Sequence, residues 1–323
     1  MVKKKSQPKK RKTKRKKRVD YKLQILKIIS GFFVLLSLVI MAGVLAHHFL
    51  QKPPGFKDLS PATLQNTHNA HDTQPTFEIF PKEKSAGLTP RLNYYPVTGN
   101  STPKVAIIID DLGYDRKIAD KFLKLDRKLT FSILPFAPYR KSITEAIHKK
   151  GFEIMLHLPL EPNEFPKVNP GPGALLVSMT RAQFISQLEQ DIASVPYIKG
   201  VNNHMGSRIT TMTPKMNQIF SVLKNKGLFF IDSRTTSATI CKKSAASGNI
   251  PFAQRDIFLD HVQNEKFIRK QFQHLLKIAE HKGTAIGICH PHQITYKVIR
   301  QILPEFEKKV ELVPASSLVR NTG

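Results

Sequence analysis

Short apolar runs alternate with amphipathic stretches from Lys104 to the end of the chain. An apolar run of four to seven residues is typical of a buried strand, whereas apolar residues spaced three and four apart indicate a helix with one buried face. The predicted strands are residues 105–110, 129–134, 152–158, 200–204, 228–232, 256–260, 284–290 and 310–313. The predicted helices lie near residues 116–126, 140–150, 180–194, 214–226, 264–282 and 294–303.

The order of these elements predicts a parallel sheet covered by helices. Three helices end in glycine directly before the next strand, in "HKKGF", "KNKGL" and "EHKGT". Glycine commonly stops a helix because it adopts a left-handed conformation without steric cost. Seven or eight such units within residues 104–318 favour an irregular, TIM-like (β/α)7 barrel, with an open sheet as the alternative.

The first hundred residues have a different pattern. Residues 28–46, "IISGFFVLLSLVIMAGVLA", carry no charge. At a rise of ~1.5 Å per residue such a helix spans about 28 Å, close to the hydrocarbon thickness of a bilayer. We therefore predict a membrane-anchoring helix within residues 28–50, preceded by a basic tail (1–27). Residues 51–103 are rich in Pro, Thr, Asn and Gln and are predicted to be a flexible linker.

The formal net charge of +27 first suggests a nucleic-acid partner. Residues 1–27 alone carry 14 Lys or Arg and one acidic residue, so almost half of the excess charge lies beside the apolar segment. Basic residues in this place keep the N-terminal side of a membrane helix in the cytoplasm, and the rest of the chain is then exported. We therefore expect no nucleic-acid partner, although binding through the tail stays as a lesser alternative. Because "VLA" is an acceptable cleavage site, secretion after cleavage near Ala46 is the alternative to a retained anchor.

Only two cysteines occur, Cys241 and Cys289. In an oxidising compartment one disulfide is compatible with this number, and two unpaired thiols are equally so. Two cysteines this far apart do not make a zinc knuckle.

Polar residues gather where the predicted strands end. In a parallel β/α barrel the C-terminal ends of all strands lie on one face, and that face carries the active site. Helix capping explains a single Asp or Asn in such a place, but a carboxylate pair with several histidines indicates a divalent metal site. The polar residues at strand ends are Asp110, Asp111, His157, Asn203, His204, Asp232, Asp260, His261, His290 and His292.

Two histidines and a carboxylate, with one position open for water, form a common catalytic zinc set. Such a site also accounts for the adjacent carboxylates of Asp110 and Asp111. A bound cation neutralises one of them, and the other remains available as a base.

The motifs "VAIIIDDLGYD", "GFEIMLHLPLEP", "NNHMGSR", "LFFIDSRTT", "RDIFLD" and "AIGICHPH" occur in this order. Together they resemble the divergent polysaccharide deacetylase family of Gram-negative envelopes, a distant branch of the NodB-like deacetylases. The resemblance covers residues 104–318. It implies a seven-stranded β/α barrel, a carbohydrate substrate and a divalent metal, with Zn²⁺ as the first candidate.

By position, the resemblance implies Asp110 as the catalytic base and Asp111 as a metal ligand. The wider family supplies two histidines four residues apart after its third strand, but this chain has His157 and then Glu161. His204 of the "NHMGS" motif is the replacement, so that the predicted metal ligands are Asp111, His157 and His204. Glu161 is either a fourth ligand or a supporting residue.

The late "L-x-H" motif of the family implies His290 as the general acid, with His292 as a rival. Cys289 and Gln293 stand where the divergent branch usually has Gly and Pro. The remaining candidates are predicted to support the metal ligands or to contact substrate, and they are Asn203, Arg208, Asp232, Arg234 and Asp260.

These observations predict a metal-dependent hydrolase that removes N- or O-acetyl groups from a cell-envelope polysaccharide. It is expected to be a single-pass inner-membrane protein with its C-terminal domain in the periplasm. The alternative is an inactive glycan- or protein-binding module on the same barrel, because the second family histidine is missing.

Overall fold

The computed structural model describes Met41, residues 102–125 and residues 127–321. The basic tail, the linker up to Ser101 and all of the predicted anchor except Met41 fall outside this part, so those predictions stay untested. Within the described residues, no helix combines the length and the apolar character that crossing a membrane requires.

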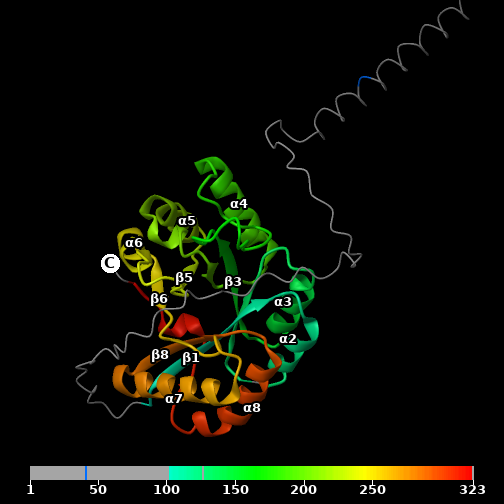
Figure 1. Cartoon of the computed structure of the whole chain (residues 1–323), viewed down its shortest axis with the longest axis vertical. Helices are drawn as coiled ribbons and strands as arrows, with labels where there is room; N and C mark the ends of the chain where they lie inside the picture. Colours follow the sequence, from blue (N-terminus) through cyan, green and yellow to red (C-terminus); the bar gives the residue numbers. More distant parts are fainter. Residues whose placement is uncertain (1–40, 42–101, 126, 322–323) are drawn as a thin grey trace, which may run out of the picture. The chain divides into compact units, whose positions relative to one another are not determined.

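The described domain is built around one curled sheet, with helices packed along its outer side (Figure 1). Its strand order is β10-β6-β5-β4-β3-β2-β1-β8-β7, and β9 pairs with β1 beside this path. All pairings are parallel except that of β10 with β6. The strands are β1 (Lys104–Leu112), β2 (Thr130–Ile133), β3 (Glu153–Leu160), β4 (Gly200–Met205), β5 (Phe229–Asp232), β6 (Pro251–Gln254), β7 (Ile257–Phe258), β8 (Thr284–Cys289), β9 (Glu311–Leu312) and β10 (Arg320–Asn321).

Helices follow most of the strands, as the sequence predicts. Gly151, Gly227 and Gly283 have φ values of 72°, 66° and 78°, which confirms the glycine-terminated helices. The α-helices are α2 (Arg116–Leu123), α3 (Arg140–Lys149), α4 (Arg181–Ser194), α5 (Thr213–Asn225), α6 (Cys241–Gly248), α7 (Glu265–Lys282) and α8 (Gln293–Phe306), and two 3-10 helices are η1 (Ile209–Thr211) and η2 (Ala315–Leu318).

The two faces of the sheet pack into separate apolar clusters. In β1, Val105, Ile107 and Ile109 belong to the large cluster shared with the helices, whereas Ala106 and Ile108 belong to a smaller inner cluster. This follows from the strand period of two residues. The inner cluster continues through Met155, Phe229, Ile231, Phe258, Ile286, Ile288 and Ala315.

The predicted barrel is only partly formed, because hydrogen-bonded pairing does not join the two edges of the described sheet. The segment 251–258 pairs with β5 through β6 and with β8 through β7. At its middle, the Arg255 amide donates to the Asp232 carbonyl and the Asp256 amide donates to the Ile286 carbonyl, both at 2.9 Å. One extended segment therefore spans the gap of an incomplete barrel. The predicted strand 256–260 is shorter in the structure, where β7 comprises Ile257 and Phe258.

The sequence analysis missed α6 and β6. Their apolar residues are few and show neither a helical nor a strand period over a useful length. Cys241 at the start of α6 and Cys289 at the end of β8 are buried and unpaired, which decides between the two alternatives for the cysteines.

A testable contact lies at the start of β4, inside the sheet. A Cβ added to Gly200 would stand 2.2 Å from the Phe229 ring, whereas a Cβ added to Gly151 would meet nothing within 4 Å. Gly200→Ala should therefore lower the free energy of unfolding by about 1–3 kcal/mol through overpacking, and Phe229→Leu should restore part of it. Gly151→Ala is the matched control, because the added methyl group meets no neighbour. Its only expected cost in unfolding free energy is that of holding alanine in the left-handed conformation, about 1–2 kcal/mol. Urea unfolding of the parent, the two single variants at Gly200 and Phe229, their double variant and Gly151→Ala measures this. Additive losses in the double variant would contradict the packing.

Candidate metal centre

Asp110 and Asp111 both face the C-terminal end of the sheet interior, although adjacent strand residues normally point to opposite faces. The pairing of β1 with β2 shifts register between Ile109 and Leu112, and Asp111 has a φ of 54°. This left-handed turn at a non-glycine residue lets the second carboxylate face the same side as the first. A buried strand can thus end in two carboxylates that meet the same neighbours.

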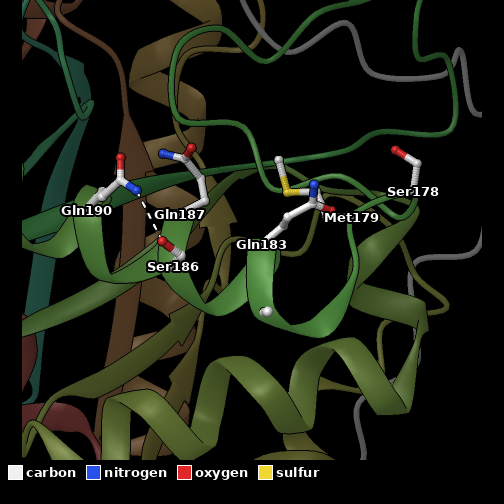
Figure 2. A pocket seen from close by; sticks show the side chains of 7 residues that line it. Ser178, Met179, Gln183, Ser186, Gln187 and Gln190 are labelled. Atoms are coloured by element: carbon white, nitrogen blue, oxygen red, sulfur yellow. Dashed lines mark hydrogen bonds between the residues drawn. The ribbon is translucent and has the colours of Figure 1, made fainter. Parts of the chain in front are cut away.

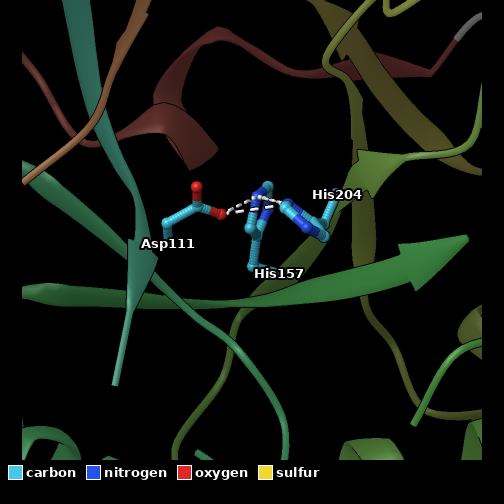
Figure 3. Close-up of side chains that lie close together, drawn as sticks. All are labelled: Asp111, His157 and His204. Atoms are coloured by element: carbon cyan, nitrogen blue, oxygen red, sulfur yellow. Dashed lines mark hydrogen bonds and ion pairs between the residues drawn. The ribbon is translucent and has the colours of Figure 1, made fainter. Parts of the chain in front are cut away.

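Three side chains converge on one point at this end of the sheet (Figure 3). The Asp111 Oδ1 atom lies 3.1 Å from His157 Nε2 and 3.0 Å from His204 Nδ1. The two histidine nitrogens are 3.2 Å apart. All three residues are buried and come from β1, β3 and β4. The nearly equilateral triangle brings together the three metal ligands predicted from the sequence.

This triangle fits a divalent ion better than a hydrogen-bond network. Two histidine nitrogens lie near the Asp111 carboxylate, but neither of its oxygens accepts a well-directed hydrogen bond within the described residues. His204 Nε2 also has no hydrogen-bond partner among these residues. Ligand atoms about 2.0–2.2 Å from a tetrahedral Zn²⁺ lie about 3.3–3.6 Å from one another, slightly farther apart than the three atoms here. A buried carboxylate with two histidine nitrogens at this spacing is an arrangement that a cation would complete.

Asn202 connects the triangle to Asp110. Its Oδ1 atom lies 2.9 Å from His157 Nδ1, and its Nδ2 donates to both oxygens of Asp110 at 2.9 Å. The Ser132 hydroxyl also donates to Asn202 Oδ1, at 2.5 Å. A histidine that uses Nδ1 as donor keeps the Nε2 lone pair for a metal. Asn202 therefore orients a predicted ligand and the predicted base together.

Burial raises the pKa of Asp110, and the nearby His157 and His290 and the Asn202 hydrogen bond reduce this shift without cancelling it. Burial acts in the same direction on Asp111, but His204 and His157 outweigh it and hold the pKa of Asp111 well below its usual range. For His157, burial is opposed by Asp110 and Asp111, which raise its pKa to about 9. The two neighbouring carboxyls are thus driven toward different roles, one as a base and one as a permanent anion.

His290 lies on the other side of Asp111 and is held by Asp260. Its Nδ1 lies 3.0 Å from Asp260 Oδ1, and its Nε2 lies 3.7 Å from Asp111 Oδ2. The other oxygen of Asp260 accepts hydrogen bonds from the His290 amide and the Thr295 hydroxyl, both at 2.7 Å. Although burial lowers the pKa of His290, Asp260 and Asp111 raise it to about 10. A protonated imidazole whose Nε2 faces Asp111 suits a proton donor.

His292, the predicted rival of His290, precedes α8 and is only partly buried. Its Nε2 lies 3.0 Å from Gln263 Nε2, and burial lowers its pKa. With Asp260 and His290 it forms a second group whose ligand atoms lie within 4.8 Å of one another. The geometry favours His290 over His292 as the proton donor beside Asp111.

Two predicted residues point away from the inner face. Asn203 donates to the Met205 carbonyl at 2.8 Å and accepts from the Ser233 amide at 2.9 Å, so it fixes the backbone between β4 and β5. Asp232 accepts from the Arg234 amide and the Thr239 hydroxyl, at 2.7 and 2.8 Å, and caps the turn after β5. Strand alternation accounts for both, because Asn202 and Ser233 take the inward positions next to them.

Glu161 lies outside the triangle and is held by other groups. Its Oε1 pairs with Arg208 at 2.5 Å, and its Oε2 accepts from the Val177 amide at 2.7 Å. The Glu161–Arg208 pair therefore ties the loop after β3 to the loop after β4, beside the site.

The predicted residue Arg234 also lies outside the triangle. Its side chain donates a hydrogen bond to Gln254 at 3.2 Å.

A separate hollow of about 680 Å³ runs along α4 (Figure 2). Serine and glutamine side chains line it, including Ser186 and Gln190, which share a hydrogen bond of 3.3 Å. None of its lining residues is titratable. This hollow can offer hydrogen bonds, but the residues suited to acid–base or metal chemistry lie at the C-terminal ends of the strands.

The chain matches known proteins over the described domain. The model of the divergent polysaccharide deacetylase family matches residues 107–319. The uncharacterized protein YibQ of Escherichia coli K12 is 32% identical over 216 residues, covering 67% of each chain. An uncharacterized protein of Haemophilus influenzae is 32% identical over 218 residues, covering 68% of this chain and 77% of the relative.

A crystal structure of similar fold is that of the uncharacterized protein ATU2773 from Agrobacterium tumefaciens C58. It has a TM-score of 0.66 and 25% identity, and the match covers 70% of this chain and 93% of the other. The family model and the relatives cover the same region as the motifs, which confirms the resemblance seen in the sequence. The chain belongs to the divergent polysaccharide deacetylase family.

Proposed function

We propose that this protein is a metal-dependent hydrolase that removes N- or O-acetyl groups from a cell-envelope polysaccharide. The observation that carries the proposal is the buried triangle of Asp111, His157 and His204, with Asp110 3.8 Å from His157 and His290 3.7 Å from Asp111. The family gives the carbohydrate class of the substrate. The order of base, ligand set and acid around one point supports hydrolysis.

Asp111, His157 and His204 would hold the metal, with Zn²⁺ as the first candidate. A divalent ion supplies Lewis acidity, which makes water a stronger acid and polarises a carbonyl group. Asp110 would accept the proton of the attacking water, since burial raises its pKa toward the working range of a base. Asn202 holds both Asp110 oxygens, so the lone pair that takes the proton keeps a fixed direction.

His290 would donate a proton from Nε2 to the departing nitrogen or oxygen of the sugar. Asp260 fixes its ring through Nδ1 and favours the protonated form. Loss of acetate from an amide needs this proton, because an amine anion is a poor leaving group. The proposed base and the proposed acid thus both lie beside the ligand triangle.

We also propose that the domain works in the periplasm, anchored to the inner membrane by a helix within residues 28–50. The charge-free run 28–46 behind a basic tail supports this placement. An envelope polysaccharide would be within reach of such a domain.

An inactive glycan- or protein-binding module is the second candidate. It is favoured by Glu161, which stands in the place of a family histidine and pairs with Arg208 rather than joining the triangle. This candidate predicts that glycan binding persists without metal and without release of acetate.

Metal content distinguishes the two candidates. The purified full-length chain should bind close to one Zn²⁺, and His204→Ala should weaken the affinity at least about 100-fold, since a ligand is removed. His281→Ala is the matched control, because His281 lies exposed on α7. Metal analysis and competition with a chelator measure the effect. Equal zinc content in His204→Ala and in the parent protein would argue against the ligand set.

The proposed base is tested by Asp110→Asn, which keeps the shape of the side chain. We expect kcat for acetate release to fall by about 10²–10⁴-fold, the usual contribution of a general base. Zinc content should stay unchanged, since Asp111 rather than Asp110 is the proposed ligand. Turnover equal to that of the parent protein would remove this mechanism.

A further inference from the structure

Two aromatic rings are exposed in the loop that follows β2. Phe136 is 36% exposed and Tyr139 is 50% exposed, and among the described residues after Ser101 the other exposed large hydrophobic side chains are Tyr197 and Val262. The loop sequence is "LPFAPY", and Tyr139 immediately precedes α3. Exposed aromatic rings on a loop beside a site are candidates for contact with a ligand or a partner.

This loop is attached to the rim of the candidate metal centre. Strand β2 lies between β1 and β3, which carry Asp111 and His157. The Leu134 amide donates to the Leu112 carbonyl, and the Tyr139 amide donates to the Gly113 carbonyl, both at 2.9 Å. The loop is therefore bonded to the residues that directly follow Asp111.

The contact between the two loops is also close in space. A Cβ added to Gly113 would lie 2.4 Å from the Ala137 Cβ, so only glycine allows the approach. Tyr114, the next residue, is half-buried, and burial together with the charge of Asp111 raises its pKa. Tyr114 thus brings a further aromatic side chain to this part of the rim.

Phe136 is held in one orientation rather than left free to move. Its φ is 58°, a conformation that a bulky residue adopts only when its surroundings impose it. The Arg140 guanidinium lies 5.8 Å from the ring centre and is itself fixed by the carbonyls of Ala137 and Ser194. A Cβ at Gly173 would lie 3.1 Å from Phe136 Cε2. An exposed ring with a fixed position is pre-organised for stacking.

We propose that Phe136 and Tyr139 form a stacking platform for one pyranose ring of the polysaccharide, next to the sugar whose acetyl group reaches the metal centre. The proposal rests on the proposed function. A pyranose presents an apolar C–H face that complements the electron-rich face of an aromatic ring. The platform would fix the sugar chain so that its neighbouring unit enters the site.

A sugar ring fits this surface better than a protein partner does. Stable protein interfaces need about 800 Å² from each partner, which two partly exposed rings on one loop do not supply. The Tyr139 hydroxyl adds a polar group at the edge, where sugar hydroxyls need donors and acceptors.

The test uses the full-length protein and a β-1,4-linked pentamer of N-acetylglucosamine as the probe. Calorimetry should show binding to the parent protein that is weakened about tenfold or more in Phe136→Ala/Tyr139→Ala, the range expected for lost stacking. Phe136→Tyr and Tyr139→Phe keep the rings and should bind within about twofold of the parent. Zinc content should not change in the double variant, because the proposed ligands Asp111, His157 and His204 are untouched.

Tyr197→Ala is the matched control. Tyr197 is also exposed, at 51%, and has a φ of 65°, but it lies before β4, at the opposite ends of the strands, where it stacks on His148. Its removal should leave binding of the pentamer unchanged.

The outcomes separate this proposal from the proposed function. Binding that depends on the two rings, without any release of acetate, would support the platform and defeat the deacetylase. Equal binding by the parent and the double variant would overturn the platform, and so would no binding by the parent. Self-association that is lost in the double variant, without glycan binding, would assign the rings to a protein contact instead.

Discussion

The site depends on the burial of two adjacent carboxylates. Asp110 and Asp111 are 1% and 6% exposed. Removing an ionised carboxylate from water costs several kcal/mol unless opposite charges or hydrogen-bond donors compensate. The surroundings supply different compensation to each: Asn202 donates to Asp110, while His157 and His204 face Asp111. The positive groups around this pair, and the left-handed turn at Asp111, follow from that requirement.

The curled parallel sheet makes this compensation geometrically available. Strands β1, β3 and β4 bring Asp111, His157 and His204 to one end, and β8 adds His290. Residues two apart share a face, so Asn202 reaches inward together with His204. The inner cluster of apolar side chains, from Ala106 to Ile288, fills the sheet below them. The polar groups therefore lie next to a layer of packed apolar side chains, where the low dielectric constant strengthens each charge interaction.

Much of this arrangement could be predicted from the sequence, because strand ends in a parallel sheet meet on one face. The triangle, the position of His290 directly after β8 and the glycine-terminated helices follow from that rule and from the family motifs. Which of two neighbouring polar residues points inward could not be predicted, because it depends on the register of each strand. Asn203 was therefore chosen in place of Asn202, and Asp232 was included although Ser233 faces the site. The inward positions could have been found by counting in steps of two from Gly200 to Asn202, and from Phe229 and Ile231 to Ser233.

Other features depend on long-range contacts that leave no local pattern. The pairing of Glu161 with Arg208 joins residues 47 positions apart. Segment 251–258 changes its partner strand at Arg255, from β5 to β8. Each half is therefore too short to show the sequence pattern of a complete strand. The contact between Gly113 and Ala137, which positions the loop that carries Phe136 and Tyr139, also could not be predicted from the sequence.

The measurement that tests the central claim most directly is anomalous X-ray diffraction at the zinc edge from crystals of the protein. The account predicts one strong peak, at bonding distance from Asp111, His157 and His204, about 2.0–2.2 Å from each ligand atom. A peak at Asp260, His290 and His292 instead, or no peak in crystals soaked in zinc, would contradict it.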